Sequence, residues 1–110
     1  MLRDEILSAG KLPSESVTVP GVETPVIVRG LSAAGRASLF ATCFDDQGKA
    51  IDGKFYAAEL IVRCCEDEAG DKVFSLRDAD LVASMKSSIV DPLFAAAQRL
   101  SSLKDAEKNS

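Results

Sequence analysis

The sequence predicts an α+β fold, with an N-terminal β-hairpin followed by a small bundle of about four helices. Two short β-branched runs near the N-terminus predict the hairpin. From residue 32 onward, apolar residues recur every three or four positions, which is the spacing of amphipathic helices. A chain of 110 residues has room for one domain. We therefore expect a single α+β domain over residues 1–104 and a flexible polar tail at residues 105–110.

The hairpin is predicted from two segments that turn residues separate. Ser16–Val19 alternates polar and apolar residues, and Pro25–Arg29 is a compact β-branched run. Residues 20–24 supply the turn, beginning with Pro-Gly. A short helical segment over residues 2–7 precedes the hairpin. The two runs are expected to pair as antiparallel strands.

Three helices of the bundle have recognisable start signals. One begins at Ser32, a plausible N-cap. A short one, from residue 76 to about 85, follows a capping box formed by Ser75 and Asp78. The last runs over about residues 88–104, with a proline expected in its first turn, where a missing N–H costs little.

The segment Lys54–Glu66 is predicted to be the central helix, because it is apolar over most of its circumference. Its polar residues Glu59, Arg63 and Glu66 are expected to form a narrow exposed stripe. Glu59 and Arg63 have the i,i+4 spacing of a favourable ion pair. Other elements of the same chain normally enclose such a helix, although another subunit or a partner could bury part of it.

The charge distribution favours a protein partner. The net charge is −4, and the lysines and arginines are dispersed along the chain. Binding to nucleic acid or to an anionic membrane surface requires clustered cations, so both are disfavoured. We also find no signal-peptide pattern and no apolar run of transmembrane length. The expected location is the cytoplasm.

The cysteines Cys43, Cys64 and Cys65 are predicted to be reduced and buried. Their odd number and irregular spacing match neither a disulfide framework nor a zinc site. Neighbouring cysteines on a helix point in different directions, so Cys64 and Cys65 are poorly placed to bridge each other. We expect them to act as small hydrophobic core residues.

The sequence offers no credible catalytic, metal or cofactor site. It contains no histidine, the commonest general base and metal ligand. Its glycines form no phosphate-binding loop, and its acidic clusters do not match a calcium loop. We therefore predict that the protein is not an enzyme and uses no cofactor. An enzyme that relies on carboxylates alone, such as Asp67 or Asp71, is a distant alternative.

The candidate surface for protein binding or self-association comes from the two most apolar helices. Small residues at 95–97 would allow another helix to approach closely. The better-supported alternative for the last helix is that its apolar stripe packs on the domain's own core. The candidate residues are Phe55, Leu60, Ile61, Leu93, Phe94, Ala97 and Leu100.

The order of segments resembles a known family. The stretches that carry the resemblance are LPSESVTVP at residues 12–20, VIVRGLS at 26–32 and LIVRCCEDEAGDKVF at 60–74, with the capped helix after Ser75. Over nearly the whole chain, from about residue 3 to 103, this order is similar to that of the tail assembly chaperones of long-tailed, siphovirus-like bacteriophages and prophages.

The resemblance implies a chaperone that binds the tape measure protein and keeps it soluble until the tail tube polymerises. It implies no cofactor, a location in the host cytoplasm and absence from the mature virion. Family members often have a longer frameshifted form that contacts tail tube subunits. Glu107-Lys108-Asn109 can be encoded by GAA-AAA-AAC, which contains a slippery heptamer. An ordinary polar terminus is the alternative for these residues.

Two further functions stay open at this point. The chain could be a structural head–tail joining or tail-completion protein, which would persist in the finished particle. It could also be a small adaptor unrelated to phage. Self-association into a homo-oligomer is compatible with each of these functions.

Overall fold

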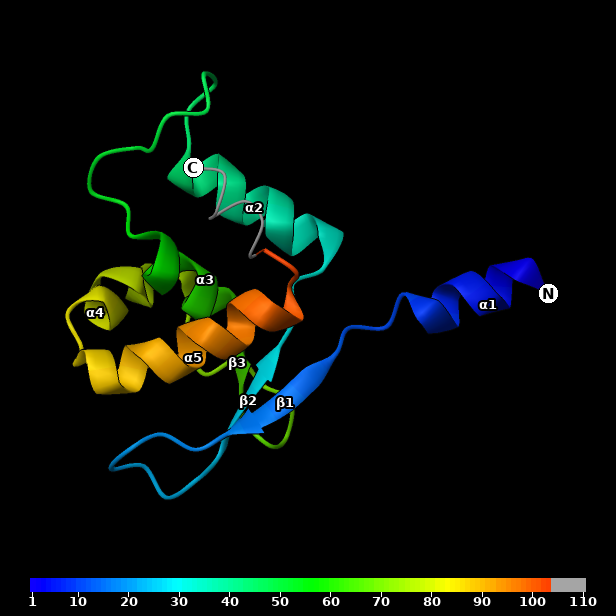
Figure 1. Cartoon of the computed structure of the whole chain (residues 1–110), viewed down its shortest axis with the longest axis horizontal. Coiled ribbons are helices and arrows are strands. Elements are labelled where there is room, and N and C mark those ends of the chain that lie inside the picture. The colour runs from blue at the N-terminus through cyan, green and yellow to red at the C-terminus, as the bar shows by residue number, and fades with distance from the viewer. Residues whose placement is uncertain (104–110) are drawn as a thin grey trace.

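A computed structural model describes residues 1–103, and helix α3 lies at the centre of its folded body (Figure 1). The predicted tail at 105–110, with the frameshift signal at 107–109, lies outside the described residues. In chain order, the elements are α1 (Leu2–Ala9), β1 (Ser14–Val17), β2 (Val26–Arg29), α2 (Ala33–Cys43), α3 (Tyr56–Cys64), β3 (Cys65–Glu66), the 3-10 helix η1 (Leu76–Asp78), α4 (Ala79–Ala83) and α5 (Ser87–Leu100).

The α+β class is confirmed, but the arrangement differs from a hairpin followed by a bundle. Helix α1, where a short helical segment was expected, precedes the hairpin, so that the described residues form five α-helices in all, four of them after the hairpin. The hairpin strands pair antiparallel as predicted, with Ser14 opposite Arg29. A third strand, β3, joins the sheet after α3 and places Cys65 opposite Val28. The sheet order is therefore β1-β2-β3.

The strand boundaries differ because backbone pairing, rather than residue alternation, decides them. The first strand spans residues 14–17 instead of 16–19. A hydrogen bond from the Gly30 N–H to the Pro13 carbonyl, at 2.9 Å, continues the pairing beyond Ser14. Val19 lies outside the strand and is buried in the core. The loop between the strands consequently covers residues 18–25.

Helix α3 is the central helix, as predicted. The predicted boundaries of this helix and the predicted exposure of its polar stripe were wrong. Every residue from Ala58 to Cys64 is buried, and the helix packs against α2, α4 and α5. It ends at Cys64 rather than Glu66, because Cys65 has an extended backbone and pairs with β2. The stripe of Glu59, Arg63 and Glu66 is buried, not exposed, because α2 and β2 supply polar partners for it.

The predicted helix starts agree with the structure in part. Ser32 caps α2, and its Oγ accepts from the Gly35 N–H at 3.0 Å. The Asp78 carboxylate accepts from the Ser75 N–H at 2.9 Å, as expected for the capping box. The short helix is split into η1 and α4. Because α5 begins at Ser87, Pro92 lies in its second turn instead of its first.

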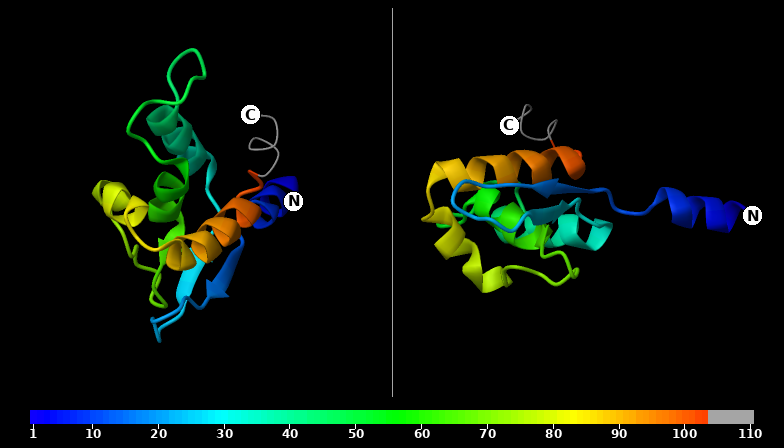
Figure 2. Two further views of the ribbon diagram at one scale, coloured as in Figure 1. Left: turned by 60° about the vertical axis from the view of Figure 1, so that its left-hand side comes forward. Right: turned by 90° about the horizontal axis from the view of Figure 1, so that it is seen from below.

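Helix α1 stands apart from the body. All of its residues are exposed, and Figure 1 and Figure 2 show it extending beyond the start of β1. In Figure 2, right, α5 lies on one side of the sheet and α3, while α2 and the segment that leads to α4 lie on the other. Within residues 1–103, none of the helices has both the length and the hydropathy that crossing a membrane requires.

Gly30 lies where β2 passes the C-terminal end of α5. A Cβ at this position would be 2.5 Å from the Leu100 carbonyl oxygen, so only glycine allows this approach. The next residue, Leu31, donates its N–H to Ser101 Oγ at 2.9 Å. The junction fixes the last helix to the sheet.

We predict that Gly30→Ala lowers the free energy of unfolding by roughly 1–3 kcal/mol, the usual cost of forcing extra volume into a packed site. Urea denaturation followed by circular dichroism measures the change. Gly48→Asn is the matched control, since Gly48 has open space around it and a positive φ that asparagine tolerates. Equal unfolding midpoints for Gly30→Ala and the wild type would contradict the close approach.

Candidate protein-interaction groove

The structure distributes the candidate binding residues between the core and the surface. Leu60, Ile61, Leu93 and Ala97 are buried in the chain's own core. Phe94 and Leu100 are partly buried and pack against that core, whereas Phe55 is 60% exposed. These side chains therefore do not form one accessible surface. The placement of Leu93 and Ala97 agrees with the alternative that the last helix packs on the domain's own core.

An open groove lies elsewhere, between the β2–α2 connection, the C-terminal end of α3 and the segment 72–76. Its volume is about 640 Å³. Aliphatic and aromatic side chains form its apolar part, and charged groups and serine hydroxyls form its polar part. The apolar lining residues are Leu12, Leu31, Val62, Val73, Phe74 and Leu76, and the charged ones are Arg29, Arg63, Glu66 and Lys72.

Arg63 forms the polar floor of the groove. Its Nη1 donates to the Glu59 carboxylate at 2.9 Å and to the Glu59 carbonyl at 2.8 Å. Its Nη2 donates to Ser38 Oγ and Thr42 Oγ1 of α2, both at 3.1 Å, and its Nε contacts the same serine at 3.3 Å. A buried guanidinium needs partners for all of its N–H groups, and these contacts supply them. The floor is therefore rigid, and it joins α2 to α3.

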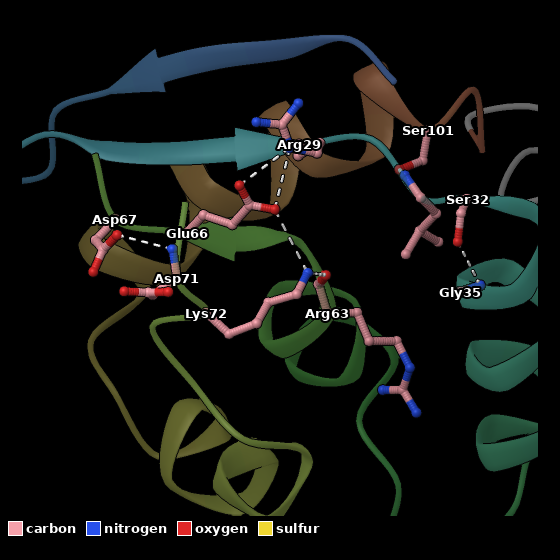
Figure 3. A network of polar contacts seen from close by, with 10 residues as sticks. Arg29, Ser32, Gly35, Arg63, Glu66, Asp67, Asp71, Lys72 and Ser101 are labelled. Atoms are coloured by element: carbon pink, nitrogen blue, oxygen red, sulfur yellow. Dashed lines mark hydrogen bonds and ion pairs between the residues drawn. The ribbon is translucent and has the colours of Figure 1, made fainter. Parts of the chain in front are cut away.

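A second set of ionic contacts forms the rim at the end of α3 (Figure 3). Arg29 Nε lies 3.1 Å from each carboxylate oxygen of Glu66. Lys72 Nζ lies 3.7 Å from the same carboxylate and donates to the Arg63 carbonyl at 2.8 Å. A cation on the last carbonyls of a helix is electrostatically favourable. This arrangement connects β2, β3 and the segment after β3 at one point.

The groove is more positive than the rest of this acidic chain. Its lining carries three cationic side chains and one carboxylate, while the chain as a whole has a net charge of −4. The negative charge of Glu59 balances the positive charge of Arg63. The charge of Glu66 balances that of one of the two rim cations, Arg29 and Lys72. One positive charge remains on the rim. The groove therefore suits an apolar segment that carries an acidic group.

We predict that Arg63→Met destabilises the protein by about 3–5 kcal/mol, because it leaves the Glu59 carboxylate buried without its partner. The double variant Glu59→Leu/Arg63→Met should lose much less, since no unpaired charge remains in the core. Urea denaturation gives both free energies of unfolding. Equal losses in the single and the double variant would show that the buried carboxylate does not depend on Arg63.

The cysteines are buried free thiols, as predicted. Burial raises the pKa of Cys64 to about 11 and that of Cys65 to about 12, from a usual value of 9.0. Burial also raises the pKa of Cys43, and the nearby Glu59 carboxylate adds to this effect. Thiolates, the reactive form, are therefore scarce at neutral pH in the folded chain.

We predict that iodoacetamide modifies the cysteines slowly at pH 8 in the folded protein and rapidly in urea. Rapid alkylation without urea would contradict the burial of the thiols.

The raised pKa values also set the pH dependence of the free energy of unfolding. Below pH 9 the thiols are protonated in both states, whereas above it the unfolded chain loses its thiol protons first. The contribution of the thiols to stability should therefore fall as the pH rises from about 9 to about 12. Cys65→Val should show a shallower decline of stability over this pH range.

Within residues 1–103, no group of cysteine, aspartate and glutamate side chains could hold a metal ion. Asp67, the carboxylate named as a distant catalytic alternative, accepts from the N–H groups of Ala69 and Asp71 at 2.9 and 3.0 Å. These bonds shape the turn after β3, so the structure gives this carboxylate a local role.

Comparisons with protein-family models, with curated proteins and with solved structures give no match. Any function proposed for this chain therefore rests on the properties of the groove.

Sequence reasoning missed the groove because its residues come from four separate segments. Periodicity finds helices and strands, but it does not show that Leu12 and Leu31 lie near the loop residues 73–76. One signal was present in the sequence. Val73, Phe74 and Leu76 are large apolar residues close together at the predicted start of the short helix, and such a group at a junction indicates either a core anchor or a contact surface.

Proposed function

We propose that this protein is a binding protein for an apolar helical client, and specifically a tail assembly chaperone whose client is the tape measure protein. The groove is the observation that carries this proposal. The identity of the client rests on the sequence resemblance. In this proposal the chain acts in the host cytoplasm, needs no cofactor, performs no catalysis and is absent from the finished particle.

The shape and chemistry of the groove support a helical client. An amphipathic helix binds a groove through apolar side chains spaced three or four residues apart, and the groove offers Leu12, Val73 and Leu76 at its exposed rim. These side chains are 37%, 46% and 56% exposed, so a ligand can reach them without unfolding the body. The polar floor at Arg63 keeps the groove open, because its buried hydrogen bonds resist collapse of α2 onto the segment 72–76.

The charges of the groove indicate which client helices fit. Lys72 and Arg29 lie at the rim, and the side chain of Lys72 is 57% exposed. An aspartate or glutamate beside the apolar stripe of the client would meet these cations. The acidic remainder of the chain would keep the complex soluble while the groove covers apolar client surface.

The test is co-expression of this chain with the long, coiled-coil-rich protein encoded directly downstream. We predict that the wild type keeps the large protein soluble and co-purifies with it. Leu76→Asp should weaken binding by at least about tenfold, because it puts an unpaired carboxylate into an apolar contact. Binding is measured by pull-down and then by titration with the smallest soluble client fragment.

Leu81→Asp is the matched control for this experiment. Leu81 is 68% exposed, lies on α4 and does not line the groove. The proposal predicts that this variant binds like the wild type. Loss of binding in both variants would move the site away from the groove. A large protein that stays insoluble with the wild-type chain, together with this chain in mature particles, would refute the chaperone function and support the structural virion protein.

A further inference from the structure

Helix α1 exposes an apolar stripe that its own chain does not cover. Leu2 and Ile6 are 70% and 60% exposed, and the spacing of Leu2, Ile6 and Ala9 places them on one face of the helix. Covering these side chains would remove apolar area from water, which is favourable. In Figure 2, right, the helix lies outside the layers of the body.

We propose that α1 of one copy of this chain docks in the groove of a second copy. The groove is the same one that we propose for the client, so this self-association rests on the groove being a binding site. It does not rest on the identity of the client, and it can be measured on the purified chain alone.

The stripe on α1 has the chemistry that the groove accepts. Its aliphatic side chains match the apolar rim formed by Leu12, Val73 and Leu76. Glu5 lies at the edge of the stripe, one residue before Ile6. Docking would therefore bring a carboxylate toward the rim cations, of which Lys72 is the more exposed. Helix α1 therefore combines an apolar stripe with an adjacent carboxylate, and this combination suits the positive charge of the groove.

The backbone between α1 and β1 directs the helix away from the groove of its own chain. Leu12 lines that groove, but it precedes Pro13, which restricts Leu12 to extended conformations. Pro13 is itself fixed to the end of β2 by the hydrogen bond from Gly30. The chain therefore runs outward along the line of β1, as Figure 1 shows, and α1 is presented to another molecule.

The small size of α1 favours a reciprocal exchange between two copies. A helix of 8 residues is about 12 Å long, so one docked helix provides less contact than the roughly 1,000 Å² expected of a specific interface. When each copy places α1 in the groove of the other, the contact doubles and the pair closes with two-fold symmetry. We expect a weak dimer that forms at high concentration.

Sedimentation equilibrium over a wide concentration range tests the proposal on the full chain. The wild type and the control Leu81→Asp should dimerise with the same dissociation constant. Ile6→Asp in the helix and Leu76→Asp in the groove should each weaken dimerisation by at least about tenfold, because each places a carboxylate in an apolar contact. Both side chains are exposed in the single copy, so neither change should affect folding. Circular dichroism verifies this.

Mixing the two variants gives the decisive result. Ile6→Asp retains an intact groove and Leu76→Asp retains an intact α1, so the mixture can form one native contact that neither variant forms alone. The mixture should therefore associate more strongly than either variant and less strongly than the wild type. This gain separates exchange of α1 from the other ways in which the chain could associate.

Three results of the sedimentation experiments would overturn the proposal. A wild type that stays monomeric at all concentrations would mean that α1 has no partner copy. Weakening by Ile6→Asp alone would indicate pairing between two α1 helices, and weakening by Leu76→Asp alone would indicate contact between two grooves. A dimer that binds no client would leave self-association standing while the chaperone proposal fails.

Discussion

The C-terminal end of α3 is the point on which the rest of the structure depends. There the Arg63 guanidinium holds two hydroxyl groups of α2, and the Arg63 carbonyl accepts from Lys72. Three residues later, Glu66 holds Arg29 of β2. One short stretch therefore connects a helix, a sheet and a loop that are distant in the sequence. Because these contacts are charged and partly or fully removed from water, breaking one of them leaves a costly unpaired group.

This constraint explains why the chain has an open groove rather than a fully closed core. Buried polar groups cannot give up their hydrogen bonds to let apolar side chains close over them. The Arg63 contacts fix α2 against α3, and the side chains of Leu12, Val73 and Leu76 remain accessible in the groove.

The sequence predicted the elements whose signals are local. The antiparallel hairpin follows from β-branched runs, α2 from its Ser32 cap, and the burial of α3 from its wide apolar surface. The prediction of an exposed polar stripe on α3 was wrong, because i,i+4 spacing shows that Glu59 and Arg63 can pair but not what covers the pair. The third strand was missed since Cys65-Glu66 continues the helical pattern, and only pairing with β2 makes it extended.

The candidate groove was harder to predict than the fold for a physical reason. Apolar periodicity identifies side chains that must leave water, and the chain's own core is the nearest place for them. Leu60, Ile61 and Leu93 accordingly lie inside the core, where they cannot select a partner. The groove instead exposes Leu12, Val73 and Leu76, while Val62 and Phe74 of its lining also take part in the core packing. Val73 and Leu76, the first residue of η1, stay exposed because Lys72 and the Ser75–Asp78 cap hold the segment that bears them.

Helix α1 and the groove both expose apolar side chains to water, and the proposed exchange between two copies would cover both. An exposed apolar groove tends to cause non-specific association, and so does an exposed apolar helix. When each covers the other in a second copy, both are removed from water by a contact too small to be permanent. A client helix with a longer apolar stripe would bury more area than α1 and would displace it by mass action. If the exchange is as weak as we propose, it would protect the groove and still leave it available to a client.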